Sequence, residues 1–142
     1  MEIQVFHNDY VSDICILINQ ELGYNVSEHD LINQLVQMWK ENNYAVFIAV
    51  ENQKVIGFIG LQLCLAFEIP GKIVRIIALA VSHEFQRRGV GSKLLRQAEG
   101  FARDHGASIL LVNSGLKRKE AHQFYENQQF YRKGYSFCKK ID

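Results

Sequence analysis

Residues 74–95 read VRIIALAVSHEFQRRGVGSKLL, and this stretch decides how the rest of the chain is interpreted. The apolar run at 74–81 is typical of a buried strand, and the spacing of apolar residues that follows predicts a helix over 90–105. Between them, residues 86–92 place two arginines and two glycines at the junction. Helix N-termini carry unpaired N–H groups and partial positive charge, and glycine lets a ligand approach the backbone. The junction therefore suits a bound anion, although the stretch alone equally fits a helix start with solvated arginines.

The periodicity outside this stretch switches repeatedly between that of strands and that of helices. Strands are expected at 2–7, 44–50, 55–67, 73–81 and 108–113, with a closing hairpin-like pair within 130–141. Helices are expected from Val11 to Leu22, from Ser27 to about Asn42, at 90–105 and at 118–128. The order β-α-α-β-β-β-α-β-α-β-β predicts an α/β (or α+β) fold with a mixed sheet of about seven strands and about four helices.

Size and composition describe an ordinary globular protein. The 142 residues suit one domain over 1–142, with 48% apolar and 22% charged residues. The 16 Lys and Arg against 15 Asp and Glu leave a net charge of +1. A nucleic-acid or anionic-membrane binder needs a dominant basic field, so neither partner is expected.

The cysteines and the N-terminus carry no signal for export. The three cysteines (Cys15, Cys64 and Cys138) are odd in number and lack metal-ligand spacing, so three reduced thiols are expected. The N-terminus has acidic residues where a signal peptide needs basic ones, and no apolar run approaches the roughly 20 residues of a membrane span. A cytoplasmic protein without a bound metal is the expectation.

The glycine loop does not match two common phosphate-binding templates. A dinucleotide fingerprint needs a third glycine where Leu94 stands, and a P-loop needs Lys followed by Ser or Thr, in place of Ser92-Lys93. The stretch Gln86 to Gly91 instead fits Gln/Arg-x-x-Gly-x-Gly/Ala and resembles the acetyl-CoA pyrophosphate loop of the GNAT superfamily of N-acetyltransferases. The element order and "AHQFYENQQF" at 121–130, which resembles the late helix of that family, extend the resemblance over almost the whole chain.

The resemblance implies a GNAT fold with acetyl-CoA as co-substrate, lying between the strands at 73–81 and 108–113. Leu79 and Val81 would pair with its pantetheine arm through their backbones, like an added strand. The residues that the resemblance assigns to the cofactor are Leu79, Ala80, Val81, Gln86, Arg87, Arg88, Gly89, Val90, Gly91, Ser92 and Asn113. Asn113 would serve equally well as a turn former that ends a strand.

The reaction that the resemblance implies is a direct acetyl transfer to a primary amine. The amine attacks the thioester carbonyl, a tetrahedral intermediate forms, and coenzyme A leaves as a thiolate that needs an acid. The oxyanion donor of the family is a backbone N–H, here near Val81, and its acid is a tyrosine that matches Tyr125. A phenol with a pKa of about 10 is protonated at neutral pH. The alternative for Tyr125 is a place in a buried stripe with Ala121 and Phe124.

No residue of the strand before the loop is a candidate for the general base. Many members of the family carry Glu or His there, whereas residues 74–78 read Val-Arg-Ile-Ile-Ala. Glu68, His83, Glu84 and His122 are the remaining candidates, each fitting a surface or capping role better. A water relay to solvent is the other possibility.

The second half resembles one group of the family, the aminoalkylphosphonate N-acetyltransferases, in "VIGFIGLQL", "GVGSKLL", "AEGFARDHGA" and "KRKEAHQFY". Arg75, Ala78 and Ala66 stand where that group carries carboxylates and histidines, which argues against its substrate and a metal. Gln129 replaces the usual glycine after the late helix, so a different helix cap is expected. Arg118 replaces the asparagine that many members carry three residues before the alanine of the late helix, and it could instead reach a cofactor phosphate.

The acceptor is expected to be a small-molecule or peptide amine. Residues 23–29 usually form one wall of the acceptor pocket in this family, where Glu28 would attract a cationic amine. The alternative is a solvated residue in the first turn of a helix. An exposed last strand would favour a homodimer. A non-catalytic acyl-CoA sensor or interaction domain of the same fold is the alternative to an enzyme.

Overall fold

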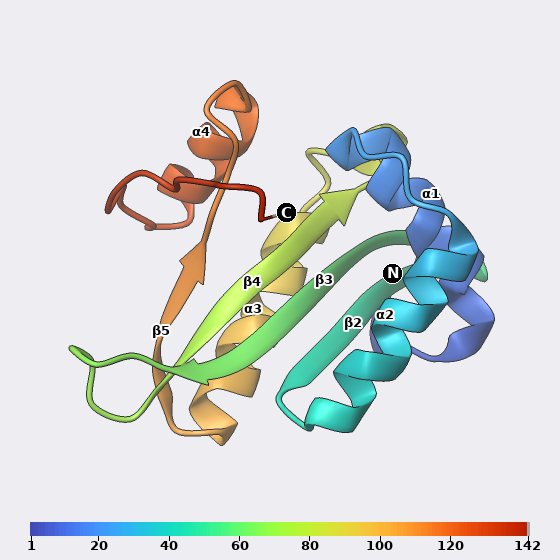
Figure 1. Ribbon diagram of the computed structural model, residues 1–142. Helices are drawn as coiled ribbons and strands as arrows, with labels where there is room; N and C mark the ends of the chain where they lie inside the picture. The colour runs from blue at the N-terminus through green and yellow to red at the C-terminus, as the bar shows by residue number, and fades with distance from the viewer. Residues whose placement is uncertain (142) are drawn as a thin grey trace. The chain divides into compact units, whose positions relative to one another are not determined.

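The computed structural model describes residues 1–141 of the chain (Figure 1). These residues form two compact units, one from Met1 to Leu111 and one that begins at Val112. The strands are β1 (Glu2–Val5), β2 (Tyr44–Glu51), β3 (Lys54–Leu65), β4 (Lys72–Val81) and β5 (Ala107–Val112). The helices are α1 (Val11–Leu22), α2 (Glu28–Glu41), α3 (Val90–Asp104) and α4 (Lys119–Asn127). Two short 3₁₀ turns, η1 (Asn8–Tyr10) and η2 (His83–Phe85), precede α1 and follow β4. The predicted order of elements is confirmed as far as α4.

The five strands form one mixed sheet in the order β1-β2-β3-β4-β5. The first four strands pair antiparallel with their neighbours, and β5 runs in the same direction as β4 (Figure 1). Asn52 and Gln53 alone join β2 to β3, and both have positive φ, at 50° and 63°. Such dihedrals match the twist of the flanking strands in a two-residue hairpin turn.

The count of about seven strands is too high, because residues 130–141 form no strand. Their alternation of apolar and polar side chains is typical of strands, but a strand persists only where a neighbouring strand supplies the hydrogen-bond ladder. No such pairing forms along these residues, and Tyr131, Tyr135 and Phe137 are 80%, 78% and 91% exposed.

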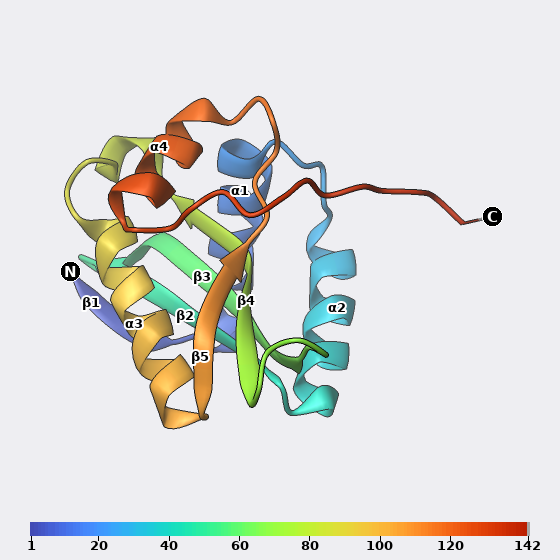
Figure 2. The same cartoon turned by 90° about the vertical axis from the view of Figure 1, so that its left-hand side faces the viewer.

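Helices cover both faces of the sheet in the first unit. Figure 2 shows α2 and α3 on opposite sides of the strands. On the face of α1 and α2, the buried cluster includes Ile14 and Leu17 of α1, Leu31 of α2, and Ile48 and Phe58 of the strands. The face of α3 that the sequence predicts to be apolar is buried at Leu94, Leu95, Ala98 and Ala102.

Gly57 allows α3 to lie close against β3 and β4. A Cβ at this position would lie 3.1 Å from the carbonyl oxygen of Ala80 and 3.2 Å from Cγ1 of Val90. These contacts are tighter than ordinary packing, so a side chain would push the start of α3 away from the sheet. The first turn of α3 is therefore held next to the end of β4.

A β-bulge interrupts β4 shortly before this end. Gly60 of β3 pairs with Ala78 and Leu61 pairs with Ile76, so Ile77 is an extra residue without a partner. Bulges change the direction in which the following residues point and occur often beside functional sites. The bulge thus changes the direction of the backbone just before the last residues of β4.

Candidate active site

The last residues of β4 present their backbone groups to the side away from β3. The N–H of Ser82 donates to the carbonyl of Ile56 at 2.8 Å, so residue 82 points toward β3. Because successive residues of a strand point their backbone groups to alternate sides, those of Val81 and Leu79 point the opposite way. The carbonyl of Val81 accepts a hydrogen bond from Nε2 of Gln86 at 3.1 Å. This edge fits the expected pairing with an extended ligand, while Ala80 between them is buried.

The loop after η2 contains two residues in the left-handed conformation. Arg87 has φ of 64° and Gly89 has φ of 81°. A side chain at Gly89 would meet nothing within 4 Å, so the conformation, rather than the available space, calls for glycine. Positive φ is uncommon for a residue such as Arg87. The loop is therefore held in a shape that few sequences adopt.

Helix α3 begins directly behind this loop. The carbonyl of Gly89 accepts from the N–H of Lys93 at 3.1 Å, so the amides of Val90 and Gly91 precede the first bond within the helix. Arg87 and Arg88 are exposed at this positive end of the helix dipole. The guanidinium of Arg88 lies 5.2 Å from the ring centre of Phe85, and this cation–π contact helps to hold the Arg88 side chain in position. Anionic oxygens are the ligands that such a combination attracts.

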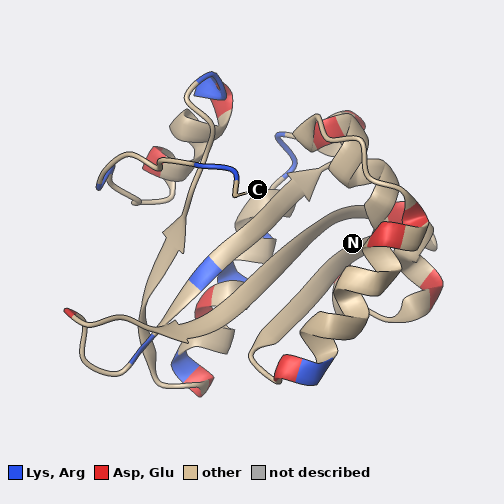
Figure 3. Ribbon diagram, viewed as in Figure 1, with Lys and Arg blue, Asp and Glu red and all other residues tan. Residues whose placement is uncertain are grey.

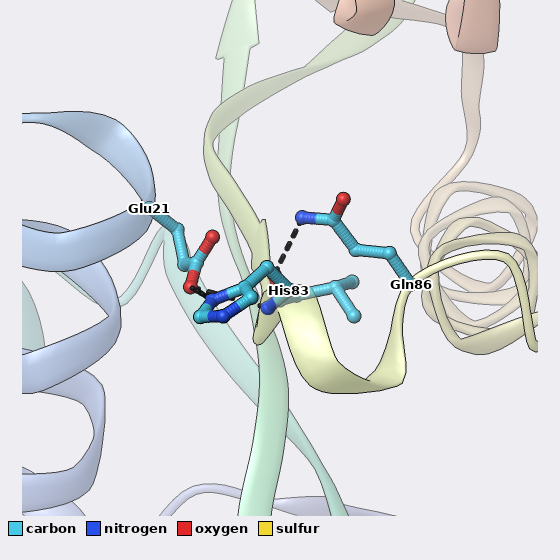
Figure 4. A network of polar contacts seen from close by, with 4 residues as sticks. Glu21, His83 and Gln86 are labelled. Atoms are coloured by element: carbon cyan, nitrogen blue, oxygen red, sulfur yellow. Dashed lines mark hydrogen bonds and ion pairs between the residues drawn. The ribbon is translucent and has the colours of Figure 1, made fainter.

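A carboxylate from α1 fastens the turn that leads into the loop (Figure 4). Oε2 of Glu21 lies 3.2 Å from the backbone nitrogen of His83 and 3.2 Å from its Nδ1. The Glu21 side chain is only 12% exposed, whereas that of His83 is 73% exposed. The end of α1, the η2 turn and the end of β4 are thus tied together by Glu21 and Gln86. No local pattern in the sequence indicates this contact, because its partners are 62 residues apart.

The segment between α1 and α2 is fixed by the side chain of Asn19. Its amide donates to the carbonyl of Val26 at 2.9 Å and accepts from the N–H of Val26 at 2.8 Å. The predicted start of α2 is confirmed, since Oγ of Ser27 accepts from the N–H of Asp30. Glu28 is exposed, and one of its oxygens accepts from Oγ of Ser12 at 2.6 Å. Glu28 thus has a partner on α1.

Tyr125 lies in the second unit, on α4, where its ring is largely enclosed. It is 8% exposed and contacts the rings of Phe124 and Phe130, each at 5.5 Å between ring centres. Burial raises the pKa of the Tyr125 phenol above 10.0, and the nearby Arg118 opposes this in part. The phenol accordingly keeps its proton at neutral pH.

The cap of α4 corrects an expectation from the sequence. Gln129 adopts φ of 71°, the conformation that a glycine would take, so the cap does not differ in shape. The N–H of Phe130 bonds to the carbonyl of Tyr125, and that of Gln129 to Glu126, both at 3.0 Å. This is the Schellman pattern with a residue other than glycine at its left-handed position, which costs energy but leaves the geometry intact.

Two other polar residues of the second unit differ in their contacts. His122 places Nε2 at 2.8 Å from the carbonyl of Gly115, so this base candidate has a structural partner. Asn113 is exposed and directly follows β5. Ser114, its neighbour, has a buried hydroxyl without a hydrogen-bond partner among the described residues.

The structure brings the predicted cofactor residues from Leu79 to Ser92 together at the end of β4 and the start of α3. Arg75 is exposed on β4, and the remaining base candidates Glu68 and Glu84 are exposed near the strand ends. Within residues 1–141, no cluster of three or more His, Cys, Asp or Glu side chains is arranged to hold a metal ion. None of the helices in the same range has the length and apolar character needed to cross a membrane.

Known proteins resemble this chain in both sequence and structure. It is 28% identical to the aminoalkylphosphonate N-acetyltransferase of Salmonella typhimurium over 90% of this chain and 80% of that protein. The aminoglycoside 6'-N-acetyltransferase AAC(6')-IG of Acinetobacter haemolyticus covers all of both chains with a TM-score of 0.83 and 21% identity. AAC(6')-Iy, in complex with the bisubstrate analogue CoA-S-monomethyl-acetylneamine, has a TM-score of 0.83 and 16% identity, with 99% and 98% of the two chains covered. The two structural likenesses establish the fold.

A family model of acetyltransferases matches residues 11–130, which include β4, the glycine loop and α4. The match covers most of the chain and extends into both compact units. On this evidence the chain belongs to the acetyltransferase (GNAT) family.

Proposed function

We propose that this chain is an acetyl-CoA-dependent N-acetyltransferase that moves the acetyl group directly to a primary amine. The observation that carries the proposal is the arrangement at the end of β4. There the backbone of Leu79 and Val81 faces away from β3 and leads into a glycine loop at the start of α3. The family match over 11–130 runs through both compact units and supports one catalytic domain over 1–142.

Acetyl-CoA would be held by backbone groups and by local positive charge. Leu79, Ala80 and Val81 would pair with the pantetheine arm, and the residues from Gln86 to Ser92 would hold the pyrophosphate at the helix start. The left-handed conformations of Arg87 and Gly89 support this assignment, because they turn the loop around the amides of Val90 and Gly91. Asn113 is proposed as a further contact from the end of β5.

Direct acetyl transfer needs an oxyanion donor, an acid for the sulfur and a route for the proton of the amine. A backbone N–H near Val81 would stabilise negative charge on the carbonyl oxygen during attack by the amine. Tyr125 would donate its phenolic proton to the sulfur as the C–S bond breaks, and its raised pKa supports a proton that is present at neutral pH. The proton lost by the amine would pass to solvent, because β4 offers Arg75 where a base would stand.

Glu28 is proposed to attract the protonated amine before it reacts. The support is its exposure beside the segment 23–27, which Asn19 holds in place. Its bond to Ser12 fixes the position of the carboxylate without neutralising its charge. A homodimer and a cytoplasmic location stay predictions.

Mass spectrometry of products tests the function. The protein is incubated with acetyl-CoA and a panel of amines that includes amino acids, aminoalkylphosphonates, aminoglycosides and peptides with free N-termini, and release of the CoA thiol is followed in parallel. Acetylated product that depends on the protein is expected, with none from a Gly89→Asp variant. Tight acetyl-CoA binding without any product would favour the sensor, which the missing base on β4 also suggests.

A further inference from the structure

A row of three polar side chains crosses the sheet on the face of α1 and α2. Tyr44 of β2 pairs with Gln62 of β3, and Gln62 pairs with Arg75 of β4, so the three lie side by side. Four residues before Gln62 on β3, Phe58 belongs to the buried cluster beneath α1 and α2. Since side chains alternate between faces, this polar row (Tyr44, Gln62 and Arg75) shares that face but lies past the end of the cluster.

Arg75 is a cation without a carboxylate partner in the part of the chain that the structure describes. Its side chain is exposed, and it forms no ion pair with any carboxylate among residues 1–141. Strands β3 and β4 contain no acidic residue, and Figure 3 shows the middle of both in tan except for one blue segment on β4. Lys72 also lies on β4, but its odd separation from Arg75 places it on the opposite face. Lys54 of β3 adjoins Val55, which belongs to the buried cluster on this face, so Lys54 also points to the opposite face. On this face, β3 and β4 therefore present a single positive charge.

The polar row is prepared to receive hydrogen-bond acceptors. Nε2 of Gln62 donates to the hydroxyl oxygen of Tyr44 at 3.2 Å. With its oxygen accepting this bond, the hydroxyl can still donate its own proton to a ligand. The guanidinium of Arg75 adds a planar set of donors whose geometry matches the two oxygens of a carboxylate.

Small residues separate the polar row from the candidate active site. Gly60 and Ala78 form the next cross-strand pair on this face, and the bulged Ile77 is 40% exposed. Arg75 precedes Leu79 by four residues, or about 13 Å of strand. An arginine side chain extended along the strand would cover part of this span, so a group held by Arg75 can belong to a small molecule that reacts at the end of β4.

We propose that Arg75 determines specificity by binding a carboxylate on the acceptor, so that the preferred substrates are amines that also carry a carboxylate, such as amino acids. The inference rests on the proposed acetyltransferase function and names the substrate class for its site. One guanidinium, with no other charged side chain of β3 or β4 on this face, balances a monoanion. A phosphonate dianion would call for a second cation, which this face of β3 and β4 does not supply.

Matched amines test the inference with the full-length protein and acetyl-CoA. Amino acids from glycine to 5-aminopentanoate are compared with alkylamines of the same length and with the corresponding aminoalkylphosphonates. We expect kcat/KM to be at least about tenfold higher for the best carboxylate than for its alkylamine. In Arg75→Gln this value should fall about 10–100-fold for the carboxylate, mainly through KM, and stay within about twofold for the alkylamine. Arg75→Lys should retain part of the preference.

Lys72→Gln is the matched control, because it removes a positive charge from the other face of β4. It should leave kcat/KM unchanged for both the carboxylates and the alkylamines. Equal rates for carboxylates and alkylamines, or an equal loss of both in Arg75→Gln, would overturn the inference and leave the acetyltransferase function standing. A clear preference for phosphonates over carboxylates would overturn the choice of a monoanion. Failure of the wild-type protein to acetylate any amine would instead remove the proposed function, and this inference with it.

Discussion

One oxygen of Glu21 contacts His83 twice, at 3.2 Å from its backbone nitrogen and at 3.2 Å from Nδ1. Glu21 belongs to the last turn of α1, and His83 opens the turn that leads into the glycine loop. The contact therefore connects the end of α1, which directly precedes the segment expected to face the acceptor, with the segment expected to hold acetyl-CoA. A hydrogen bond to a charged group contributes more than one between neutral groups.

Replacement of Glu21 should loosen the loop more than it harms the fold. Glu21→Ala removes the acceptor of both contacts and should lower the melting temperature by a few degrees. We expect the KM for acetyl-CoA to rise several-fold in Glu21→Ala. Glu21→Gln keeps an acceptor oxygen for the backbone N–H, so its KM should lie between those of wild type and Glu21→Ala. Glu84→Ala removes an exposed carboxylate from the same turn and serves as the control. An unchanged KM in Glu21→Ala would show that the loop keeps its position without this contact.

The charge of an aspartate at position 89 should abolish binding of acetyl-CoA. Gly89→Asp places a negative charge in the expected pyrophosphate seat, and Gly91→Asp should do the same. Gly89→Ala imposes only the cost of a left-handed non-glycine residue, roughly 1–2 kcal/mol, because φ is 81° and the space around it is open. Calorimetric titration with CoA separates the two effects. Equal affinity of the folded Asp and Ala variants would place the pyrophosphate elsewhere.

Loss of the phenolic proton should slow the proposed reaction. Tyr125→Phe keeps the ring contacts with Phe124 and Phe130 and should lower kcat about 10²–10⁴-fold, or roughly 3–5 kcal/mol of barrier. Affinity for acetyl-CoA and the melting temperature should stay close to wild type. A lowered melting temperature with turnover within a few-fold of wild type would assign Tyr125 to the core alone.

The same residue should make the fold sensitive to alkaline conditions. Because burial raises the pKa of Tyr125 above 10.0, the folded state favours the neutral phenol. The resulting stability is fully present below pH 10.0 and is lost as the pH rises through the pKa in the folded state. Urea denaturation between pH 8 and 11 (about the range in which phenols begin to ionise) should show a steeper decline for wild type than for Tyr125→Phe. Parallel curves would contradict the enclosed phenol.

A glycine at position 129 should stabilise the protein. Gln129 has φ of 71° at the left-handed position of the α4 cap, where glycine avoids a clash of Cβ with the backbone. Gln129→Gly should raise the free energy of unfolding by about 1 kcal/mol, less the entropy that glycine adds to the unfolded chain. Gln128→Gly, at φ of −93°, gains no such relief and should destabilise. Thermal or urea unfolding of the two variants distinguishes them.

Much of the first unit could be predicted from the sequence, because each element there is specified by neighbouring residues. The face from Val11 to Leu22 ends at Gly23, which takes the left-handed conformation with φ of 77°, and Ser27 caps α2 as its sequence context indicates. Such local signals need no knowledge of the rest of the fold. The prediction of closing strands within 130–141 was wrong, because a strand needs a neighbouring strand to pair with as well as an alternation of apolar and polar side chains.

The candidate site divides in the same way. The loop at 86–92 was recognisable because its glycines and arginines are contiguous, whereas the fastening by Glu21 joins residues 62 positions apart. The bulge at Ile77 also had no local signature, since it arises from the pairing of Gly60 with Ala78 and of Leu61 with Ile76. The polar row could not be predicted either, because the neighbours of Arg75 follow only from the register of β2, β3 and β4. One-dimensional patterns report spacing along the chain and not contacts across a sheet.

The agreement between strand order in the sheet and strand order in the chain has a consequence for how the protein folds. The hairpin of β2 and β3 closes through two residues whose positive φ angles are already those of the turn, and β4 then adds to its free edge. Pairings between strands that are close in sequence require little loop-closure entropy. We therefore expect this three-stranded meander to form early in folding. The strands that position the end of β4 would then pair before Glu21 of α1 makes its contact with His83.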